Sequence, residues 1–243
     1  MLGRIAVLAC VLVCGCDVVF RVDHVEGDGV GSDAPSGIQY VQSAGQALGG
    51  LTNNALPFPR EVKTGNLIVV AVAVFRGTLL GVTDSAGNAY MLAQPGLESD
   101  GLTYLHVRYA QNVVGADRLV VTAIANGATD TEISMAIHEY SGATLDAALD
   151  QHVLMSGHDG TPVQIGPVVT STDGQLHFAA VVHDNTNVTT AGPGYTIRER
   201  PSESNVGVTP LVTEDMIGTA GSITAEFGLA TSSSWVGALF TFR

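Results

Sequence analysis

One stretch decides the fold, and it reads Asn66-Leu67-Ile68-Val69-Val70-Ala71-Val72-Ala73-Val74-Phe75. Its apolar side chains occupy consecutive positions, and successive side chains of a strand point to opposite faces. A strand formed here is therefore apolar on both faces. Such a run is typical of a central strand that is buried on both sides.

Outward from this stretch, strand signals recur along the chain from Ile38 onwards. Most of them alternate between apolar and polar positions, which predicts strands with one face in a core. The further strands predicted in this way are 103–110, 118–125, 132–140, 175–183, 222–229 and 234–242. The side chains expected to face a core are Leu105, Val107, Tyr109, Leu176, Phe178, Ala180, Val182, Ile223, Ala225, Phe227, Leu229, Val236, Ala238, Phe240 and Phe242.

Turn-forming residues separate these stretches. They lie at 85–88, 126–127, 173–174 and 192–194 and are rich in glycine, asparagine, aspartate and proline. The sequence offers one helical signal, at 145–151. We therefore expect residues 38–243 to form one all-β domain, a two-sheet antiparallel β-sandwich of jelly-roll (concanavalin-like) type.

The composition agrees with a folded domain and limits its partners. The chain has 243 residues, of which 46% are apolar and 14% charged, so it can bury a sizeable core. The net charge of −13 argues against nucleic acid, because such binding depends on Lys and Arg that neutralise phosphates. Cysteines occur only at positions 10, 14 and 16, so the expected domain has neither disulfides nor zinc sites with sulfur ligands.

The first residues have the pattern of a bacterial export signal. Residues 1–15 carry one basic residue and a short apolar run, and Val13-Cys14-Gly15-Cys16 resembles a lipobox. We expect a lipoprotein signal peptide over 1–15, acylation of Cys16 and a flexible acidic tether over 16–37. The alternatives are ordinary secretion and a signal segment that is retained as a membrane anchor. The expected location is the cell envelope, with the protein lipid-anchored to the inner or the outer membrane.

Several ordered landmarks carry a resemblance to a known kind of module. They are Gly65-Asn66-Leu67, the stretch 82–90, Tyr109-Ala110-Gln111-Asn112-Val113, His138-Glu139-Tyr140-Ser141-Gly142, the stretch 194–198, Glu214-Asp215 and the stretch 233–243. Together they resemble an uncharacterised jelly-roll-like β-sandwich module that recurs in bacterial secreted and surface proteins. The resemblance spans residues 38–243. It implies a fold and a location, and it implies no particular activity.

Candidate metal ligands are few. Asp84 and Asn88 lie in an oxygen-rich turn, and Glu214-Asp215 is an acidic pair, so a calcium ion could bind at either place. A plain hairpin turn and an ion pair explain the same residues, because Asp and Asn side chains commonly bind turn amides. We therefore predict no metal or other cofactor, with calcium as the alternative.

Glu139 is the acid whose position most requires a partner. It follows Ile133, Met135 and Ile137 on one face of a predicted strand, so its carboxylate should be buried, and His138 should point to the opposite face. A buried carboxylate needs a partner. We expect an arginine, Arg198 first and Arg108 second.

The function expected from the sequence is binding without catalysis. Exposed aromatic side chains stack on sugars, and the candidates are Trp235, Tyr104, Tyr90 and Tyr195. No catalytic residue is predicted. The leading hypothesis is a surface module for adhesion or glycan binding, with a cell-surface or extracellular glycan as partner. The alternatives are a polysaccharide-acting enzyme on a jelly-roll fold, which needs two facing carboxylates, and a purely structural envelope protein.

Overall fold

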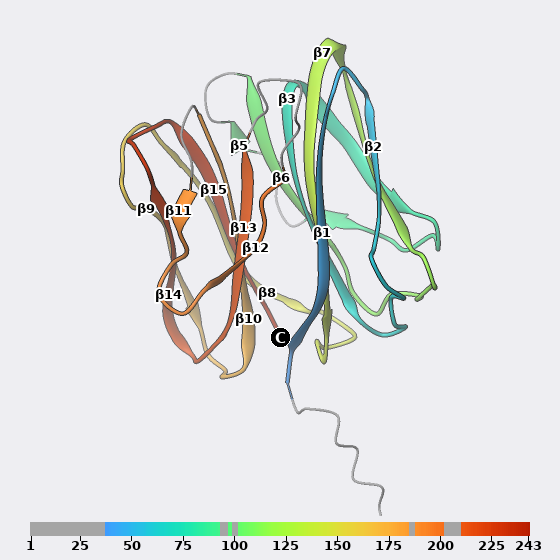
Figure 1. The fold of residues 1–243 in the computed structure, drawn as a ribbon. Helices are drawn as coiled ribbons and strands as arrows, with labels where there is room; N and C mark the ends of the chain where they lie inside the picture. Colours follow the sequence, from blue (N-terminus) through green and yellow to red (C-terminus); the bar gives the residue numbers. More distant parts are fainter. Residues whose placement is uncertain (1–36, 93–96, 99–101, 185–187, 202–209) are drawn as a thin grey trace, which may run out of the picture. The chain divides into compact units, whose positions relative to one another are not determined.

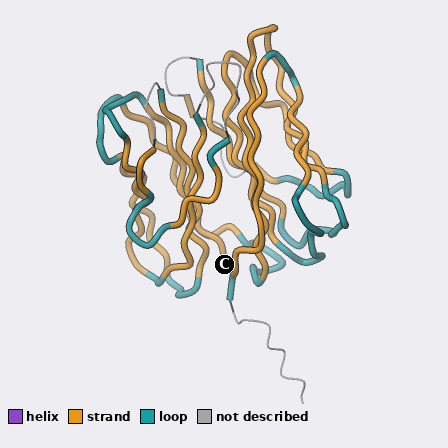
Figure 2. The backbone as a smooth tube through the Cα atoms, in the orientation of Figure 1, coloured by secondary structure: helices purple, strands orange, loops and turns teal. Residues whose placement is uncertain are grey.

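The computed structural model describes residues 37–92, 97–98, 102–184, 188–201 and 210–243. The chain divides into two units, Met1–Ala34 and Pro35–Arg243, and the described residues belong to the second. The predicted signal peptide, Cys16 and the tether up to residue 36 lie outside the described residues. Figure 2 shows strands and loops throughout the described part, which contains no helix long and apolar enough to cross a membrane.

The described residues form fifteen strands, all paired antiparallel. They are β1 (Gln39–Gly49), β2 (Asn53–Pro57), β3 (Leu67–Asp84), β4 (Met91–Leu92), β5 (Leu97–Glu98), β6 (Thr103–Ala110), β7 (Val120–Ser141), β8 (Leu149–Gly157), β9 (Val163–Thr170), β10 (Gln175–His183), β11 (Val188–Thr190), β12 (Thr196–Glu199), β13 (Leu211–Gly218), β14 (Gly221–Leu229) and β15 (Trp235–Phe242).

These strands form three sheets in the described part of the chain. A seven-stranded sheet has the order β1-β7-β3-β6-β4, with β2 also paired to β7 and β5 to β6. A five-stranded sheet has the order β12-β13-β10-β15-β8, and a three-stranded sheet the order β11-β14-β9. The predicted all-β antiparallel fold is confirmed. The prediction of two sheets is wrong, because strands β9, β11 and β14 form a sheet of their own.

The first core lies between the seven-stranded and the five-stranded sheets (Figure 1). The seven-stranded sheet contributes Leu67, Val69, Ala71, Ala73, Leu105, Val107 and Tyr109. The five-stranded sheet contributes Leu176, Phe178, Ala180, Val182, Val236, Ala238, Phe240 and Phe242. The alternation predicted for β6, β10 and β15 is thereby confirmed.

The second core covers the opposite face of β3. Ile68, Val70, Val72 and Val74 pack there, so the predicted burial of this strand on both sides is confirmed. They meet Leu56, Leu79, Val82, Val121, Ala123 and Ala125 from β2 and from the far halves of β3 and β7. Since both halves of these long strands contribute to one cluster, the β3–β7 pair folds back over its own sheet.

The fold-back corrects one predicted turn. Asn126-Gly127 was expected to separate two strands, but β7 runs through both residues and pairs them with Thr78 and Gly77. The Asn126 side chain accepts a hydrogen bond from the amide of Thr78 at 3.0 Å. The bend lies instead near Arg76, where the pairing register shifts and φ is +52°.

The third core lies between the five-stranded sheet and the three-stranded sheet. It contains Ala179, Val181, Val212, Trp235 and Leu239 from the former and Val163, Ile165, Ala225, Phe227 and Leu229 from the latter. The inward residues predicted for β14 are confirmed, with Ile223 packed against the cluster. This extra layer explains why β10, predicted to have one polar face, is buried at every position.

The helical signal at 145–151 is not realised. Residues 145–147 form a bend and β8 begins at Leu149. Ala147 has a φ of +50°, which a right-handed helix excludes. The segment is held by other partners, because the Ala148 amide donates to the side chain of Gln111 at 2.8 Å and its carbonyl accepts from the Arg243 amide at 2.8 Å.

Glu139 is fully buried, as predicted, but the predicted arginine partner is wrong. Its carboxylate accepts hydrogen bonds from Gln42 Nε2 at 2.5 Å, from Asn66 Nδ2 at 2.6 Å and from the Lys63 amide at 2.9 Å. Arg198 lies on the other side of the sheet, the side to which the neighbouring His138 points. Amide donors that reach the second core, and not a guanidinium, therefore satisfy this acid.

We predict that Glu139→Ala lowers the free energy of unfolding by about 3 kcal/mol, because three donors lose their acceptor in a buried place. Urea unfolding measures the loss. In double-mutant cycles Glu139→Ala should couple with Asn66→Ala and be additive with Arg198→Ala. Coupling to Arg198 and none to Asn66 would contradict this assignment.

Candidate functional site

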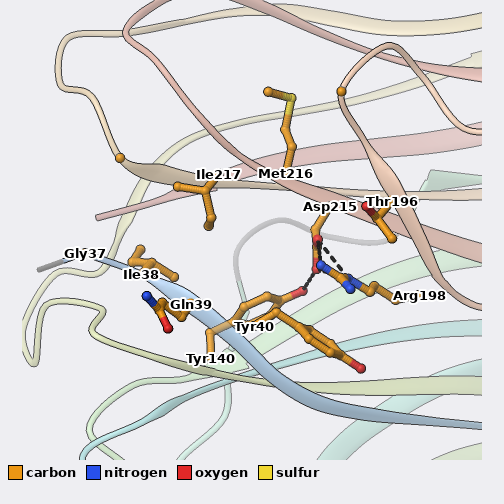
Figure 3. A pocket seen from close by; sticks show the side chains of 12 residues that line it. Gly37, Ile38, Gln39, Tyr40, Tyr140, Thr196, Arg198, Asp215, Met216 and Ile217 are labelled. Carbon is orange, nitrogen blue, oxygen red and sulfur yellow. Dashed lines mark hydrogen bonds and ion pairs between the residues drawn. The ribbon is translucent and has the colours of Figure 1, made fainter. Parts of the chain in front are cut away.

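A pocket opens between the edge strand β1 of the seven-stranded sheet and the edge strand β12 of the five-stranded sheet. Its volume is about 590 Å³. The residues that line it are Gly37, Ile38, Gln39, Tyr40, Tyr140, Gly174, Gly194, Thr196, Arg198, Asp215, Met216 and Ile217 (Figure 3). We call it the Asp215 pocket.

Strand pairing brings the polar groups of this pocket together from four strands. Asp215 and Leu211 share the β13 face that looks toward the first core. Tyr140, near the end of β7, lies opposite Tyr40 of β1 in the sheet register. Arg198 comes from β12, which pairs with β13. The two sheets therefore each supply half of the site.

An ion pair occupies the inner end of the Asp215 pocket. Arg198 Nε donates to both oxygens of Asp215, at 2.9 and 3.0 Å, and Arg198 Nη2 lies 2.8 Å from Oδ1. The Tyr140 hydroxyl donates to Oδ2 at 2.6 Å (Figure 3). Only 3% of the Asp215 side chain is exposed, against 24% of Arg198, so the arginine is the member of the pair that a ligand can reach.

The Tyr40 ring packs against the guanidinium of Arg198. The Arg198 guanidinium carbon lies 3.8 Å from the centre of the Tyr40 ring, which is a cation–π contact. The Tyr40 hydroxyl is 2.8 Å from the Ser43 hydroxyl, and Ser43 donates to Glu199 at 2.5 Å. The aromatic ring and the guanidinium are thus held in one arrangement before any ligand arrives.

The electrostatics keep both donors protonated. Burial alone would lower the pKa of Arg198, but the hydrogen bonds and charge of Asp215 raise it. Burial raises the pKa of Tyr140 well above its usual value, and the charge of Asp215 adds to this effect. Tyr140 is therefore a hydrogen-bond donor at any ordinary pH and not a base or nucleophile.

The predicted aromatic residues do not gather at one place. Trp235 and Tyr195 are buried in the third core, 6% and 9% exposed, and a Cβ added at Gly157 would lie 2.8 Å from the Trp235 ring. Tyr104 is half-buried and stacks on His106. The lining of the Asp215 pocket includes none of these side chains, nor that of Tyr90.

The candidate metal ligands lie in two places. Asp84, Asn88 and Tyr90 meet in one turn, where Asp84 accepts hydrogen bonds from the Ala86 and Asn88 amides at 3.0 Å, from Asn88 Nδ2 at 2.8 Å and from the Tyr90 hydroxyl at 3.0 Å. Its oxygens thus serve the turn itself. Within the described part of the chain, no three His, Cys, Asp or Glu residues are grouped so as to hold a metal ion.

Glu214 and Asp215 point to opposite faces of β13 and cannot share a ligand. Glu214 faces the third core, is fully buried and accepts a hydrogen bond from the Gly192 amide at 3.1 Å. Its Oε1 atom has no hydrogen-bond partner among the described residues. Burial raises the pKa of Glu214 to about 8, against the opposing hydrogen bonds from the Gly192 and Glu226 amides.

Sequence reasoning missed Tyr40 and Tyr140 as site residues and treated Arg198 and Asp215 separately. Tyr40 and Tyr140 are opposite each other only because β1 pairs with β7. Arg198 and Asp215 meet only because β12 pairs with β13. No spacing along the chain signals these contacts. The one usable signal was the buried acid with an arginine partner, which the sequence analysis assigned to Glu139.

Four histidines, His106, His138, His177 and His183, are buried, and their ring nitrogens have no hydrogen-bond partner among the described residues. Burial lowers the pKa of His106 and His183 to about 4 and that of His138 to about 3, with Arg198 adding to the effect at His138. Burial also lowers the pKa of His177. The folded protein therefore holds these side chains neutral.

We predict that stability falls on both sides of neutral pH. Below pH 6.5 the unfolded chain protonates histidines that the folded protein keeps neutral, so stability is lost as pH falls toward 4, by about 1.4 kcal/mol per pH unit for each histidine. Glu214 acts in the opposite direction. The folded protein holds its proton up to about pH 8 and the unfolded chain releases it near 4.5, so this contribution is lost as pH rises between these values.

Two variants distinguish the loss of stability at acidic pH from the loss at higher pH, with the free energy of unfolding measured in urea across the pH range. His138→Phe keeps an aromatic ring and should reduce the acid slope by about 1.4 kcal/mol per pH unit. Glu214→Gln should remove the decline between about pH 6.5 and pH 8 and make the rise between pH 4.5 and pH 6.5 steeper, because Glu214 opposes the histidines there. Slopes that are the same as in the parent protein would show that these groups titrate normally in the fold.

Comparison of the chain with protein-family models, with curated proteins and with solved structures gave no match. The structure supports the resemblance drawn from the sequence as far as an all-β protein of antiparallel sheets. The module and the location implied by that resemblance stay predictions.

Proposed function

We propose that this protein is a non-catalytic binding module that holds a glycan in the Asp215 pocket. The observation that carries the proposal is the combination in one cavity of two tyrosines with a fixed Arg198–Asp215 pair. A volume of about 590 Å³ lies within the roughly 300–1,000 Å³ common for small-ligand sites. A sugar unit needs this mixture of apolar surface and directed hydrogen bonds.

The groups that a ligand can reach suit hydroxyls. Gln39 and Thr196 are exposed at the rim, and both side chains can donate and accept hydrogen bonds, as a sugar hydroxyl does. Ile217, whose side chain is exposed, adds apolar surface for the C–H face of a sugar ring. Tyr40, half-buried, adds part of an aromatic ring.

The arrangement is preorganised, which favours binding. Ordering side chains on association costs affinity, and the Arg198, Tyr40 and Tyr140 side chains are already held by ion pairing, stacking and hydrogen bonding. A ligand therefore meets donors in place. This supports recognition through the edge of the sheets and does not require the buried Trp235.

The pocket lacks the machinery that a polysaccharide-cleaving enzyme needs. Such an enzyme commonly places two carboxyl groups roughly 5–9 Å apart across the bond to be broken. Among the described residues that line the pocket, Asp215 is the only acid, and Arg198 and Tyr140 occupy both of its oxygens. Binding without catalysis is thus the function that these contacts support best.

The proposal includes the cellular location and the finer fold type expected from the sequence. A signal peptide over residues 1–15 and an acylated Cys16 would tether the domain to a membrane of the cell envelope, and several acyl chains give stable anchoring where one is marginal. The jelly-roll type of sandwich belongs to the same proposal. A tethered module with an open pocket fits adhesion to extracellular or cell-surface glycans.

We predict that Cys16→Ser moves the protein, expressed in a bacterial host, from the membrane to the soluble fraction of the envelope, because the side chain can no longer be acylated. Cell fractionation and labelling with a fatty-acid analogue measure this change. Cys14→Ser is the matched control and should leave both labelling and membrane association unchanged. Persistent labelling of Cys16→Ser would refute the anchor.

We predict that Arg198→Ala weakens glycan binding by about ten-fold or more, because it removes the reachable donor and the support for Tyr40. The full-length protein in detergent is screened on a glycan array, and the affinity for the best glycan is then measured by calorimetry. Arg76→Ala is the matched control, since Arg76 also pairs with an aspartate and stacks on an aromatic ring but lies outside this pocket.

Thr196→Ala separates binding from folding. Thr196 is an exposed lining residue, so its loss should weaken binding without changing the free energy of unfolding. The proposed function is wrong if no glycan binds to the parent protein. It is also wrong if Arg198→Ala and Thr196→Ala bind the glycan as tightly as the control Arg76→Ala.

A further inference from the structure

We infer that the Asp215 pocket selects uncharged sugars over sugars that carry carboxylate or sulfate groups. This inference rests on the proposed glycan-binding function and deepens it. Of the twelve lining residues only Arg198 and Asp215 carry charge, and they lie in direct contact. The side chains of the pocket therefore sum to no net charge, although an arginine stands at its wall.

The ion pair also uses one of the two edges by which Arg198 could recognise an anion. Arginine owes its preference for carboxylates to two parallel hydrogen bonds from neighbouring N–H groups. In this protein Nε and Nη2 already donate to Asp215. The N–H groups that remain are the second one of Nη2 and the two of Nη1, and Asp215 offsets the charge behind them, so they meet a ligand as hydrogen-bond donors for hydroxyl oxygens and not as a free cation.

Stacking restricts the guanidinium further. One face of the group lies 3.8 Å over the Tyr40 ring, so Arg198 cannot turn its fork toward the pocket without losing that contact and the bonds to Asp215. An acidic sugar would instead place a second carboxylate beside that of Asp215, on a guanidinium whose charge Asp215 already offsets.

The charge of the whole chain acts in the same direction. The protein carries 23 acidic residues against 10 Lys and Arg, a net charge of −13. Glu199 lies on the same strand as Arg198, with its carboxylate hydrogen-bonded to Ser43 beside Tyr40. Such a field slows and weakens the approach of anions and leaves neutral ligands unaffected.

The experiment uses pairs of probes that share a sugar backbone and differ in charge. Oligogalacturonate and its fully methyl-esterified form have the same sugar backbone, and an array adds neutral glycans with their uronic-acid or sulfated counterparts. Binding to the full-length protein is measured at low and at physiological salt. For the pair that binds best, we expect the neutral member to bind at least about ten-fold more tightly than the charged one.

Asp215→Asn tests the cause of this selectivity. Asparagine keeps the size of the side chain and an oxygen for Tyr140, but it leaves the Arg198 charge uncompensated. The ratio of neutral to acidic affinity should fall by about ten-fold or more, and binding of the acidic probe should become sensitive to salt. Tyr140→Phe is the control, because it removes a hydrogen bond to Asp215 without altering the charge balance, and its ratio should match that of the parent.

The outcomes separate this inference from the proposed function. Preference of the parent protein for acidic glycans, or an unchanged ratio in a folded Asp215→Asn variant, would overturn the inference and leave glycan binding in place. Absence of binding to any probe would overturn the proposed function itself. If Asp215→Asn does not fold, the ratio measured for the parent protein decides the matter.

Discussion

Burial of the central strand β3 on both of its faces is the constraint that the rest of the architecture satisfies. A strand that is apolar on both faces must have a layer on each side. The five-stranded sheet covers one face, and the far halves of β3 and β7 fold back over the other. The same requirement recurs one layer further on, because β10 is also buried on both sides and needs the three-stranded sheet.

An interior of this kind leaves few places for polar groups, and neighbouring residues meet the difficulty in different ways. Asp215 is reached by Arg198, which enters from the open edge of the sheets. Glu214, its neighbour in the chain, faces the third core, and burial raises its pKa to about 8. Glu139 is satisfied by amide donors from Gln42, Lys63 and Asn66. The partners of each acid thus depend on which groups pack against its own face of the sheet.

The proposed site lies where this layered packing ends. Strands β1 and β12 are the edges of their sheets, and the side chains between them are the ones that solvent and ligands can reach. Because the charges at this edge are already paired, the pocket presents aromatic, amide and hydroxyl groups and not a free cation or anion. This separates the present arrangement from a catalytic pair of carboxylates and links the packing of the sheets to the chemistry of the ligand.

Much of the fold follows from local patterns, and the site does not. Consecutive apolar residues in 66–75 and the alternation in β6, β10, β14 and β15 determined the strands and their inward residues, because side-chain direction in a strand depends only on position. The burial of Glu139 followed from the same alternation. The course of β7 through Asn126-Gly127 and the absence of a helix at 145–151 depended on partners distant in sequence.

The partners of the buried acids were likewise decided by tertiary structure. Arg198 was expected at Glu139, but the two lie on opposite faces of the seven-stranded sheet, and only the approach of β12 and β13 brings Arg198 to Asp215. Tyr40 and Tyr140 meet through the pairing of strands that are about a hundred residues apart. The sequence by itself determined the inward residues of the alternating strands, because side-chain direction follows strand periodicity. The burial of Trp235, Tyr195 and the second face of β10 depended on the three-stranded sheet. Which buried or half-buried groups touch was settled by strand order and sheet packing, which no local pattern contains.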